Sequence, residues 1–359
     1  MYHSAPHPKL TKLPPDRALV ENMNILRQVN KSIAALAELK GIANLIPNQA
    51  MLINAIVLQE AKDSSEIENI ITTQDELYQA ITTANSNMSP EIKEVINYRK
   101  ALFEGYKIID QQGFLKLNNI CEIQELLVAN NAGLRKLPGT VLKNDKTGNV
   151  VYTPPQNHDE ILELMADFIT HFNESSDLSP LINMAVLHYQ FESIHPFYDG
   201  NGRTGRLLNI LYLILNKIID VPILYLSSYI IDNKSEYYRL LNEVNRSGAW
   251  EEWILYILKG LELTARDTIE RISKIRLQLE DAILMVQQNA PKIYRKELVE
   301  LLFEYPYCKV EFVTKKLGVE RKAAARYLNT LVEIGLLRPM KIGRVMLYVN
   351  VELFTLLKK

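Results

Sequence analysis

Residues 195–206 of the chain read HPFYDGNGRTGR, and this stretch carries most of the chemistry that the sequence reveals. Gly200 and Gly202 allow the backbone to approach an anion closely, and Asn201 between them adds a side-chain amide. The apolar residues from Leu207 onward predict a helix that begins here, so that its partly positive N-terminus faces the ligand. The stretch therefore predicts the start of a helix and a site for phosphate groups.

The charged residues of this stretch complete a site for a triphosphate. Arg203 and Arg206 lie three positions apart, so the predicted helix brings their guanidinium groups to one face as a pair of phosphate ligands. Asp199 offers the carboxylate oxygen that Mg²⁺ prefers, and His195 is then available as a general base. These four side chains together indicate chemistry on a phosphoryl group.

Two other interpretations of the stretch fit its surroundings less well. Its three glycines match the dinucleotide-binding pattern, but residues 186–192 predict a helix where that pattern requires a strand. His188, Glu192 and His195 stand at helical spacings that a metal site could use. No cysteine or further histidine lies nearby in the sequence to complete a ligand set, so we expect His188 to be a core histidine.

Residues 195–206 match without departure the signature His-x-Phe-x-Asp/Glu-Gly-Asn-Gly-Arg-x-x-Arg of the Fic (filamentation induced by cAMP) family. The chain resembles this family over roughly residues 15–260. The resemblance implies a mostly helical domain that transfers AMP from ATP to a hydroxyl group of a protein. It also implies that His195 is the base and that Asp199 holds Mg²⁺. The residues that it assigns to ATP and its phosphates are Gly200, Asn201, Gly202, Arg203, Thr204, Gly205 and Arg206.

The implied reaction is an in-line attack of a Ser, Thr or Tyr hydroxyl on the α-phosphorus of ATP, with pyrophosphate as the leaving group. The partner is a target protein with such a hydroxyl, and the chain itself can serve as that target. Three alternatives stay open: the reverse reaction that removes AMP, transfer from another phosphate donor, and a nucleotide-sensing regulator that binds DNA. His195 argues against the regulator, because binding ATP alone does not require a base.

The segment SSEIEN, which begins at Ser64, allows two interpretations. Ser64 is a good N-cap, and acidic residues in a first helical turn are stabilised by the helix dipole, so a helix could simply begin here. The segment also resembles the inhibitory motif Ser/Thr-x-x-x-Glu-Gly/Asn of the Fic family, matched by Ser64, Glu68 and Asn69. This resemblance implies an inhibitory helix at about residues 62–72, in which Glu68 pairs with Arg206 and keeps ATP out of a productive position.

Residues 138–143 and 149–153 predict a short β-hairpin around the turn NDKTG. A hairpin in this place can merely connect two helices. In the Fic family the corresponding hairpin is a flap beside the active site, and the resemblance implies that Val150, Val151 and Tyr152 position the target. The free edge of a two-stranded ribbon can pair with an extended segment through main-chain hydrogen bonds.

Residues 235–245 predict an amphipathic helix on which Tyr238 and Asn245 share a face, because these residues are seven positions apart. An aromatic ring and an amide are suited to the face and the edge of an adenine. A tyrosine in the core beside a polar surface residue is the simpler explanation of this pattern. The resemblance favours the first interpretation, since it implies that both residues contact the adenine of ATP.

The composition is that of an ordinary globular protein. The chain has 359 residues, 47% of them hydrophobic and 23% charged, which allows about two or three domains. The longest apolar runs are too short and too interrupted to span a membrane, and the first residues lack the core of a signal peptide. Cys121 and Cys308 show no metal-site or disulfide spacing, so we expect buried thiols and a cytoplasmic location.

The charge is distributed unevenly along the chain. Residues 291–359 carry fourteen Lys and Arg against seven Glu, a net charge of +7, whereas the whole chain has a formal net charge of −1. Three predicted helices followed by a hairpin give this segment the element order of a winged helix. Arg321, Lys322 and Arg326 begin the helix that would face nucleic acid. A winged helix can equally serve for protein docking or for forming a homodimer.

Together these patterns predict a mainly α fold, with a helical Fic domain, a β-hairpin flap and a small C-terminal α+β winged-helix domain. We expect ATP as substrate, Mg²⁺ as cofactor and no contact with a membrane. The expected divisions are an N-terminal helical region at residues 1–110, the Fic domain at 111–260, a connecting helix at 261–289 and the winged helix at 290–359.

Overall fold

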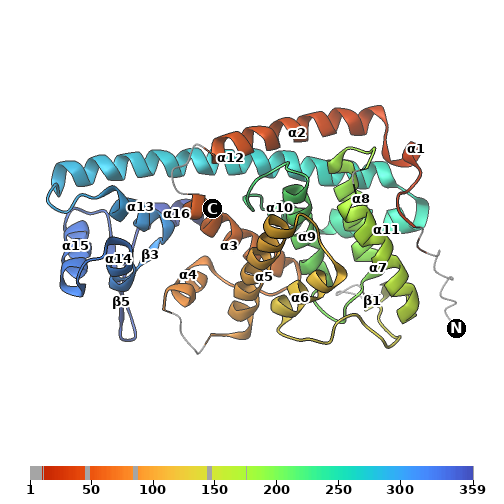
Figure 1. Cartoon of the computed structure of the whole chain (residues 1–359), viewed down its shortest axis with the longest axis horizontal. Helices are drawn as coiled ribbons and strands as arrows, with labels where there is room; N and C mark the ends of the chain where they lie inside the picture. The colour runs from red at the N-terminus through yellow and green to blue at the C-terminus, as the bar shows by residue number, and fades with distance from the viewer. Residues whose placement is uncertain are drawn as a thin grey trace.

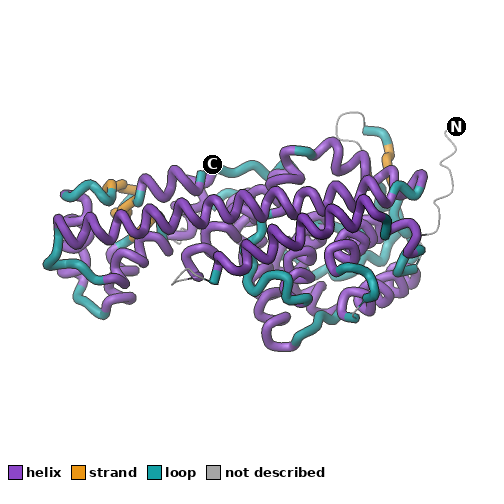
Figure 2. The backbone as a smooth tube through the Cα atoms, turned by 90° about the horizontal axis from the view of Figure 1, so that it is seen from above, coloured by secondary structure: helices purple, strands orange, loops and turns teal. Residues whose placement is uncertain are grey.

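The computed structural model describes residues 10, 12–44, 49–83, 88–143, 148–174 and 176–358. Within them the chain is mainly helical, as the sequence predicts, and its strands are short (Figure 2). In the N-terminal and central parts the elements are α1 (Arg17–Val20), α2 (Met23–Ala43), α3 (Gln49–Ile67), α4 (Gln74–Thr83), α5 (Pro90–Gln112), α6 (Leu117–Val128), β1 (Leu142–Lys143), β2 (Val150–Tyr152), α7 (His158–Asn173), α8 (Pro180–Ile194), α9 (Asn201–Leu215), α10 (Leu226–Asp232) and α11 (Lys234–Ser247). The others are α12 (Trp250–Asn289), α13 (Lys296–Glu304), β3 (Tyr307–Cys308), α14 (Val310–Leu317), α15 (Arg321–Glu333), β4 (Arg338–Ile342), β5 (Val345–Val349) and α16 (Val351–Leu357).

Helices α8 and α9 form the centre of the larger part of the molecule. Every residue of α8 from Leu181 to Ile194 is buried, and so is every residue of α9 from Leu207 to Ile214. A helix that is buried on all sides has to be surrounded by other elements, and α2, α5, α6, α7 and α12 pack around this pair. The loop that joins α8 to α9 is thereby held between two fixed helix ends.

The longest element is α12, which runs the length of the molecule with α2 packed beside it (Figure 1). Its buried residues recur every three or four positions, which is the pattern of a helix with one apolar face. The sequence predicts a connecting helix that begins at residue 261, but α12 begins at Trp250. The apolar stripe continues upstream through Trp253 and Ile257, so no boundary separates the two parts of this helix. The described part of the chain contains no helix of the length and hydropathy that a membrane span requires.

The C-terminal module, residues 291–358, contains α13, α14, α15 and the β4–β5 hairpin in the predicted order. Two further elements are not predicted. Strand β3 has only two residues and pairs with β5, which gives a three-stranded antiparallel sheet in the order β3-β5-β4. Helix α16 begins after Asn350, whose side chain accepts a hydrogen bond from the backbone N–H of Leu353 at 3.2 Å. A two-residue strand and a seven-residue helix are too short for a periodic sequence pattern.

The C-terminal module packs against α4 in addition to its covalent connection through α12. The ring of Tyr307 stacks on Tyr78 with the centroids 5.8 Å apart, and the Tyr307 hydroxyl donates to Asp75. Thr82 donates its hydroxyl to the backbone oxygen of Tyr307 at 3.2 Å. Helix α13 of the module also packs against α3, the helix that contains Ser64.

Candidate nucleotide site

The loop between α8 and α9 is shaped by two residues in left-handed conformations and by one asparagine. His195 ends α8 with φ 49°, and Gly200 precedes α9 with φ 74°. The side chain of Asn201 accepts a hydrogen bond from the Phe197 N–H and donates one to the Phe197 carbonyl, both at 2.8 Å. In this state the amide of Asn201 closes the loop, and its role as a phosphate ligand stays a prediction.

Gly200 is required by its conformation and by its neighbours. A Cβ at this position would lie 2.6 Å from Val128 and 2.9 Å from Leu127, and its positive φ would strain any other residue. Its N–H donates to the carboxylate of Asp199 at 2.7 Å. In this state the Gly200 N–H is thus occupied by the protein, and the next N–H groups at the start of α9 have no partner within their own helix.

A buried arginine that the sequence analysis did not identify binds the backbone carbonyl groups of this loop. Arg135 is fully buried, and its guanidinium donates to the carbonyl oxygens of His195 at 2.7 Å and Ile194 at 3.1 Å. The backbone N–H of Arg135 also donates to the carbonyl of Pro196 at 2.9 Å. Arg135 lies sixty positions before His195, in a segment without a helical or strand period, so the sequence contained no signal for this contact.

His195 is neutral in this structure at physiological pH. Burial, and then the positive charge of Arg135, lower the pKa of its imidazole to about 4. A neutral imidazole can accept a proton, which a general base must do. The structure therefore places an unprotonated His195 at the end of α8, next to the start of α9.

Asp199 is the exposed acidic residue of the loop, with 72% of its side chain accessible. Mg²⁺ usually binds one or two protein carboxylates and completes its shell with waters and substrate phosphates. The described part of the chain holds no cluster of three or more His, Cys, Asp or Glu residues that could bind a metal by itself. A single accessible carboxylate fits a magnesium ion that arrives with a nucleotide, and it does not fit a closed metal site.

Arg206 is almost completely buried and contacts the segment around Ser64. Its Nε donates to the Ser64 hydroxyl at 2.8 Å, and one terminal nitrogen donates to the Ser64 carbonyl at 2.8 Å and to the Glu68 carboxylate at 2.9 Å. The side chain is only 3% exposed. The pairing of Glu68 with Arg206 that the sequence analysis expects is thus present in the structure.

Arg203 contacts three carboxylates, each through a different nitrogen. Its Nε donates to Glu68 at 2.7 Å, one terminal nitrogen donates to Glu94 on α5 at 2.6 Å, and the other lies 3.5 Å from Asp199. The guanidinium is 2% exposed, whereas the side chain of Glu68 is 24% exposed. Glu94 is a site residue that the sequence analysis missed, because nothing distinguishes it from the other acidic residues of that helix.

Glu68 also lies directly over the backbone of Gly202. A Cβ on Gly202 would lie 2.6 Å from a carboxylate oxygen of Glu68 and 2.9 Å from the guanidinium of Arg206. The oxygen therefore occupies the space in front of the first turn of α9, where N–H groups and the helix dipole favour an anion. One carboxylate contacts both arginines and covers the glycine between Asn201 and Arg203.

The segment around Ser64 ends a helix and does not begin one. Ser64 lies inside α3, which ends at Ile67, and Asn69 then reverses the chain with φ 64°. Ser64 as an N-cap is therefore wrong, and so is a helix over residues 62–72. The capping pattern is misleading because the same residue types occur in the last turn of α3, where Ser64 bonds Arg206 instead of its own backbone.

Thr204 and Gly205 lie in the first turns of α9, and the backbone of Gly205 packs against α8. Thr204 is fully buried, and a Cβ on Gly205 would lie 2.5 Å from a carboxylate oxygen of Glu192. That these two residues contact phosphates stays a prediction. Each residue turns a helix by about 100°, so the positions between Arg203 and Arg206 point to another side, and Gly205 instead permits close packing of α8 against α9.

The predicted adenine residues differ in their environment. Tyr238 is 42% exposed, and its ring packs edge-on against buried Tyr237 with the centroids 5.1 Å apart. The Asn245 side chain accepts a hydrogen bond from the Tyr189 hydroxyl at 2.7 Å and donates to the Leu241 carbonyl at 3.2 Å. Tyr238 is accessible to a ligand, whereas Asn245 is engaged by the protein.

The predicted hairpin consists of β1 and β2, which pair antiparallel over fewer residues than expected. Val150 and Val151 are 54% and 49% exposed. The hydroxyl of Tyr152 donates to the carbonyl of Ser193 at 2.9 Å, which ties the strand to the end of α8 near His195. Residues 144–147 of the predicted turn lie outside the described residues.

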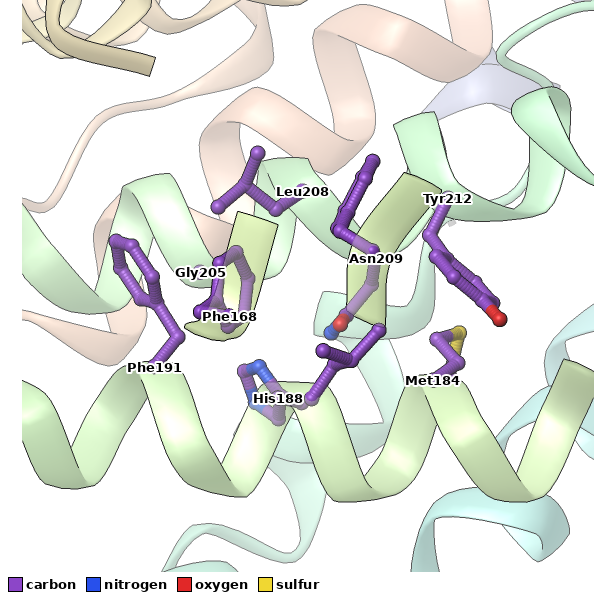
Figure 3. A pocket seen from close by; sticks show the side chains of 10 residues that line it. Phe168, Met184, His188, Phe191, Gly205, Leu208, Asn209 and Tyr212 are labelled. Carbon is purple, nitrogen blue, oxygen red and sulfur yellow. The ribbon is translucent and has the colours of Figure 1, made fainter. Parts of the chain in front are cut away.

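A small cavity behind α9 is separate from this constellation. It has a volume of about 10 Å³ and lies between Phe168, His188 and Tyr212 (Figure 3). Ligand pockets are typically larger by more than an order of magnitude, so it cannot hold a nucleotide. His188 is a core histidine as predicted: its Nε2 lies 2.9 Å from the Tyr237 hydroxyl, and burial lowers its pKa to about 3.

Comparison with protein families matches three successive parts of the chain. Residues 26–107 match the model described as Fic/DOC family N-terminal, and residues 114–213 match the Fic/DOC family model. Residues 279–353 match the model described as protein adenylyltransferase SoFic-like, C-terminal domain. The matches follow one another in the order of the observed elements and include α9 and the C-terminal module.

Curated relatives are similar over shorter stretches. Protein adenylyltransferase fic-1 of Caenorhabditis briggsae is 34% identical over 104 residues, which are 28% of this chain and 19% of that protein. Probable protein adenylyltransferase aq_aa38 of Aquifex aeolicus is 23% identical over 197 residues, 53% of this chain and 54% of that protein. The chain thus spans about half or less of the length of these relatives.

Solved structures share the fold. A Fic family protein from Desulfovibrio desulfuricans superposes with a TM-score of 0.58 at 23% identity, over 96% of this chain and 98% of that one. Fic-1 from C. elegans, residues 134–508, superposes with a TM-score of 0.55 at 20% identity, over 70% and 74% of the two chains. The three family matches together with this fold show that the chain belongs to the Fic/DOC family.

Proposed function

We propose that the chain is a protein adenylyltransferase, which transfers AMP from ATP to a Ser, Thr or Tyr hydroxyl of a protein. The observation that carries this proposal is the constellation at the start of α9. Two buried guanidinium groups converge there on one anionic position, which the Glu68 carboxylate occupies, and a neutral imidazole and an accessible carboxylate lie in the loop just before them. The curated relatives are named protein adenylyltransferases, which supports the same assignment.

In the proposed reaction the acceptor hydroxyl attacks the α-phosphorus in line with the leaving group. The new bond joins the hydroxyl oxygen to the α-phosphorus, and the bond from that phosphorus to the bridging oxygen of the β-phosphate breaks. The imidazole of His195 takes the hydroxyl proton, for which its low pKa keeps it available. Pyrophosphate leaves, and AMP remains on the acceptor as a phosphodiester.

The backbone and the two arginines of α9 supply the charge stabilisation. We assign the α-phosphate to the N–H groups of Asn201 and Gly202, where the helix dipole favours an anion. Arg203 then contacts the β-phosphate and Arg206 the γ-phosphate, so that developing negative charge on pyrophosphate is neutralised. Asp199 would hold Mg²⁺, and the ion would polarise the phosphoryl oxygens.

We propose that Glu68 inhibits this reaction in the described state. Its carboxylate bonds both guanidinium groups and covers Gly202, so a triphosphate must displace it before its phosphates can reach these groups. Ser64 strengthens the arrangement, because it accepts from Arg206 through both its hydroxyl and its carbonyl. Asn69 reverses the chain after α3 and thereby fixes where the helix ends.

The remaining roles extend the same proposal. The ring of Tyr238 would stack on the adenine. Asn245 would form hydrogen bonds with the edge of the adenine once its bond with the Tyr189 hydroxyl is broken. The exposed strand formed by Val150, Val151 and Tyr152 would pair with an extended target segment. The C-terminal module would act as a winged helix that docks a partner, and free Cys121 and Cys308 fit a cytoplasmic location.

Intact-protein mass spectrometry tests the proposed function. The full chain with Glu68→Gly is incubated with MgATP, with and without an added target protein. The chain or the added protein should gain the mass of at least one adenylyl group. The matched control is the same chain with His195→Ala as well, which should keep its original mass. A Glu68→Gly chain that binds ATP but never transfers AMP would contradict the proposal and favour a nucleotide sensor.

A further inference from the structure

We infer that Glu94 is a positioning residue, which holds the guanidinium of Arg203 in the orientation that the β-phosphate requires. The inference rests on the proposed function and names a residue of that same site. Glu94 stands on α5, 109 positions before Arg203, and accepts a hydrogen bond from a terminal nitrogen of that arginine at 2.6 Å. The side chain of Arg203 is 2% exposed, so its orientation is determined by the protein and not by water.

Each of the three carboxylates around Arg203 contacts a different nitrogen of its guanidinium. Glu68 takes Nε, Glu94 takes one terminal nitrogen, and Asp199 lies 3.5 Å from the other. When ATP displaces Glu68, the Nε edge becomes available to a phosphate oxygen. If Asp199 then turns to Mg²⁺, Glu94 is the one carboxylate of the three that still fixes the plane of the guanidinium.

Electrostatics also favour the persistence of the ion pair between Glu94 and Arg203. A buried guanidinium without a counter-charge is strongly unfavourable, and this penalty would oppose any departure of Glu68. Arg203 keeps a carboxylate partner after Glu68 leaves, because Glu94 approaches from a different helix. The pair therefore lowers the cost of releasing the inhibitory contact and keeps the Nε–H directed at the anion position.

The geometry distinguishes this role from a second inhibitory role. Glu68 contacts both Arg203 and Arg206 and covers Gly202, and these three contacts define the position that a triphosphate must occupy. Glu94 bonds Arg203 through a terminal nitrogen that Glu68 does not use. Its side chain is 37% exposed and is held on α5 by its buried neighbours Val95 and Tyr98.

Nucleotide binding to the full chain provides the test, with Glu68→Gly as the background. Titration calorimetry would compare ATP, ADP and AMP, because AMP lacks the phosphate assigned to Arg203. Glu94→Ala should weaken ATP and ADP binding about tenfold, as expected for one charge-assisted contact, and leave AMP binding unchanged within about twofold. Glu94→Gln keeps a hydrogen-bond acceptor and should lose only about threefold for ATP. Glu104→Ala, a surface carboxylate on the same helix that pairs with Lys107, is the matched control and should change nothing.

Each other outcome overturns the inference. Tighter ATP binding by Glu94→Ala would make Glu94 a second competitor for the arginine. An equal loss for AMP would indicate a general disturbance of the fold, and no loss for any nucleotide would leave Arg203 correctly placed without Glu94. A Glu68→Gly chain that binds none of the three nucleotides would contradict the proposed function itself, and the inference with it.

Discussion

The arginines of α9 and the basic residues of α15 have the same charge but opposite environments. Arg203 and Arg206 are 2% and 3% exposed, and each contacts named carboxylates. Arg321, Lys322 and Arg326 on α15 are exposed to solvent. A buried guanidinium must be paired, so the groups that it contacts mark the position where an anionic ligand can bind. Exposed charges interact weakly and with many anions. The α9 arginines therefore support a specific mechanism, and the α15 residues support only a preference for negative partners.

Removing Glu68 should produce the largest effect on activity. Glu68→Gly removes the carboxylate that both arginines share and uncovers Gly202, and losing an Arg–carboxylate contact of a few kcal/mol corresponds to about a 10- to 10³-fold gain in the rate of AMP transfer. The measurement is the initial rate of self-adenylylation at a fixed MgATP concentration. Glu66→Gly is the matched control, because Glu66 lies in the same turn and pairs with Lys62 at 2.8 Å. An equal gain from both variants would attribute the effect to a loosened helix end.

The imidazole of His195 should bind a proton about two orders of magnitude more weakly than the imidazole of an ordinary histidine. Burial and Arg135 lower its pKa from 6.5 to about 4, so the imidazole stays neutral as the pH falls through 6 and 5 and takes up a proton only near 4. An NMR titration of the imidazole carbons, assigned by comparison with His195→Gln, measures this directly. A midpoint near 6.5 would show that the base is not desolvated and would contradict the described environment.

Ser64 should contribute a smaller part of the inhibition. Ser64→Ala removes the hydroxyl that accepts from Arg206 Nε but leaves the backbone carbonyl in place, so we expect a gain in transfer of about tenfold or less. Ser65→Ala is the matched control, because its hydroxyl bonds the Ala61 carbonyl of its own helix at 2.7 Å. If Ser65→Ala raised the rate as much as Ser64→Ala, the contact with Arg206 would not be the cause.

The exposed charges of α15 should give the smallest effect for each residue. If the C-terminal module binds DNA, removing Lys322 or Arg326 should weaken binding of the full chain to a duplex by severalfold, and binding should decrease steeply with added salt as counterions are released. Fluorescence anisotropy at several salt concentrations measures both effects. Absence of binding at low salt would leave docking to a protein as the role of this module.

The comparison also explains what the sequence could and could not predict. The motif of α9 and the pairing of Glu68 with Arg206 were predictable, because the resemblance links residues that are distant in the chain. Arg135 and Glu94 were not, since their partners lie 60 and 109 positions away and no resemblance or sequence pattern links either residue to its partner. Local patterns were also ambiguous: Ser64 has the residue type of an N-cap but occurs at the end of α3.

Helix geometry gives the residues of the motif different surroundings. Thr204 is fully buried and Gly205 packs against α8, because consecutive residues of a helix point in different directions. Asn201 closes its own loop, which a linear sequence does not reveal. A sequence motif therefore identifies a site but does not separate the residues that contact a ligand from those that build the surrounding backbone.

The central claim is that Glu68 restrains the reaction by occupying Arg206. It is tested most directly by the transfer rates of four full-length chains: wild type, Glu68→Gly, Arg206→Ala, and the double variant. The account predicts that Glu68→Gly raises the rate in the wild-type background and that the gain disappears when Arg206 is absent, because both effects act through one contact. An undiminished gain from Glu68→Gly in the Arg206→Ala background would contradict it.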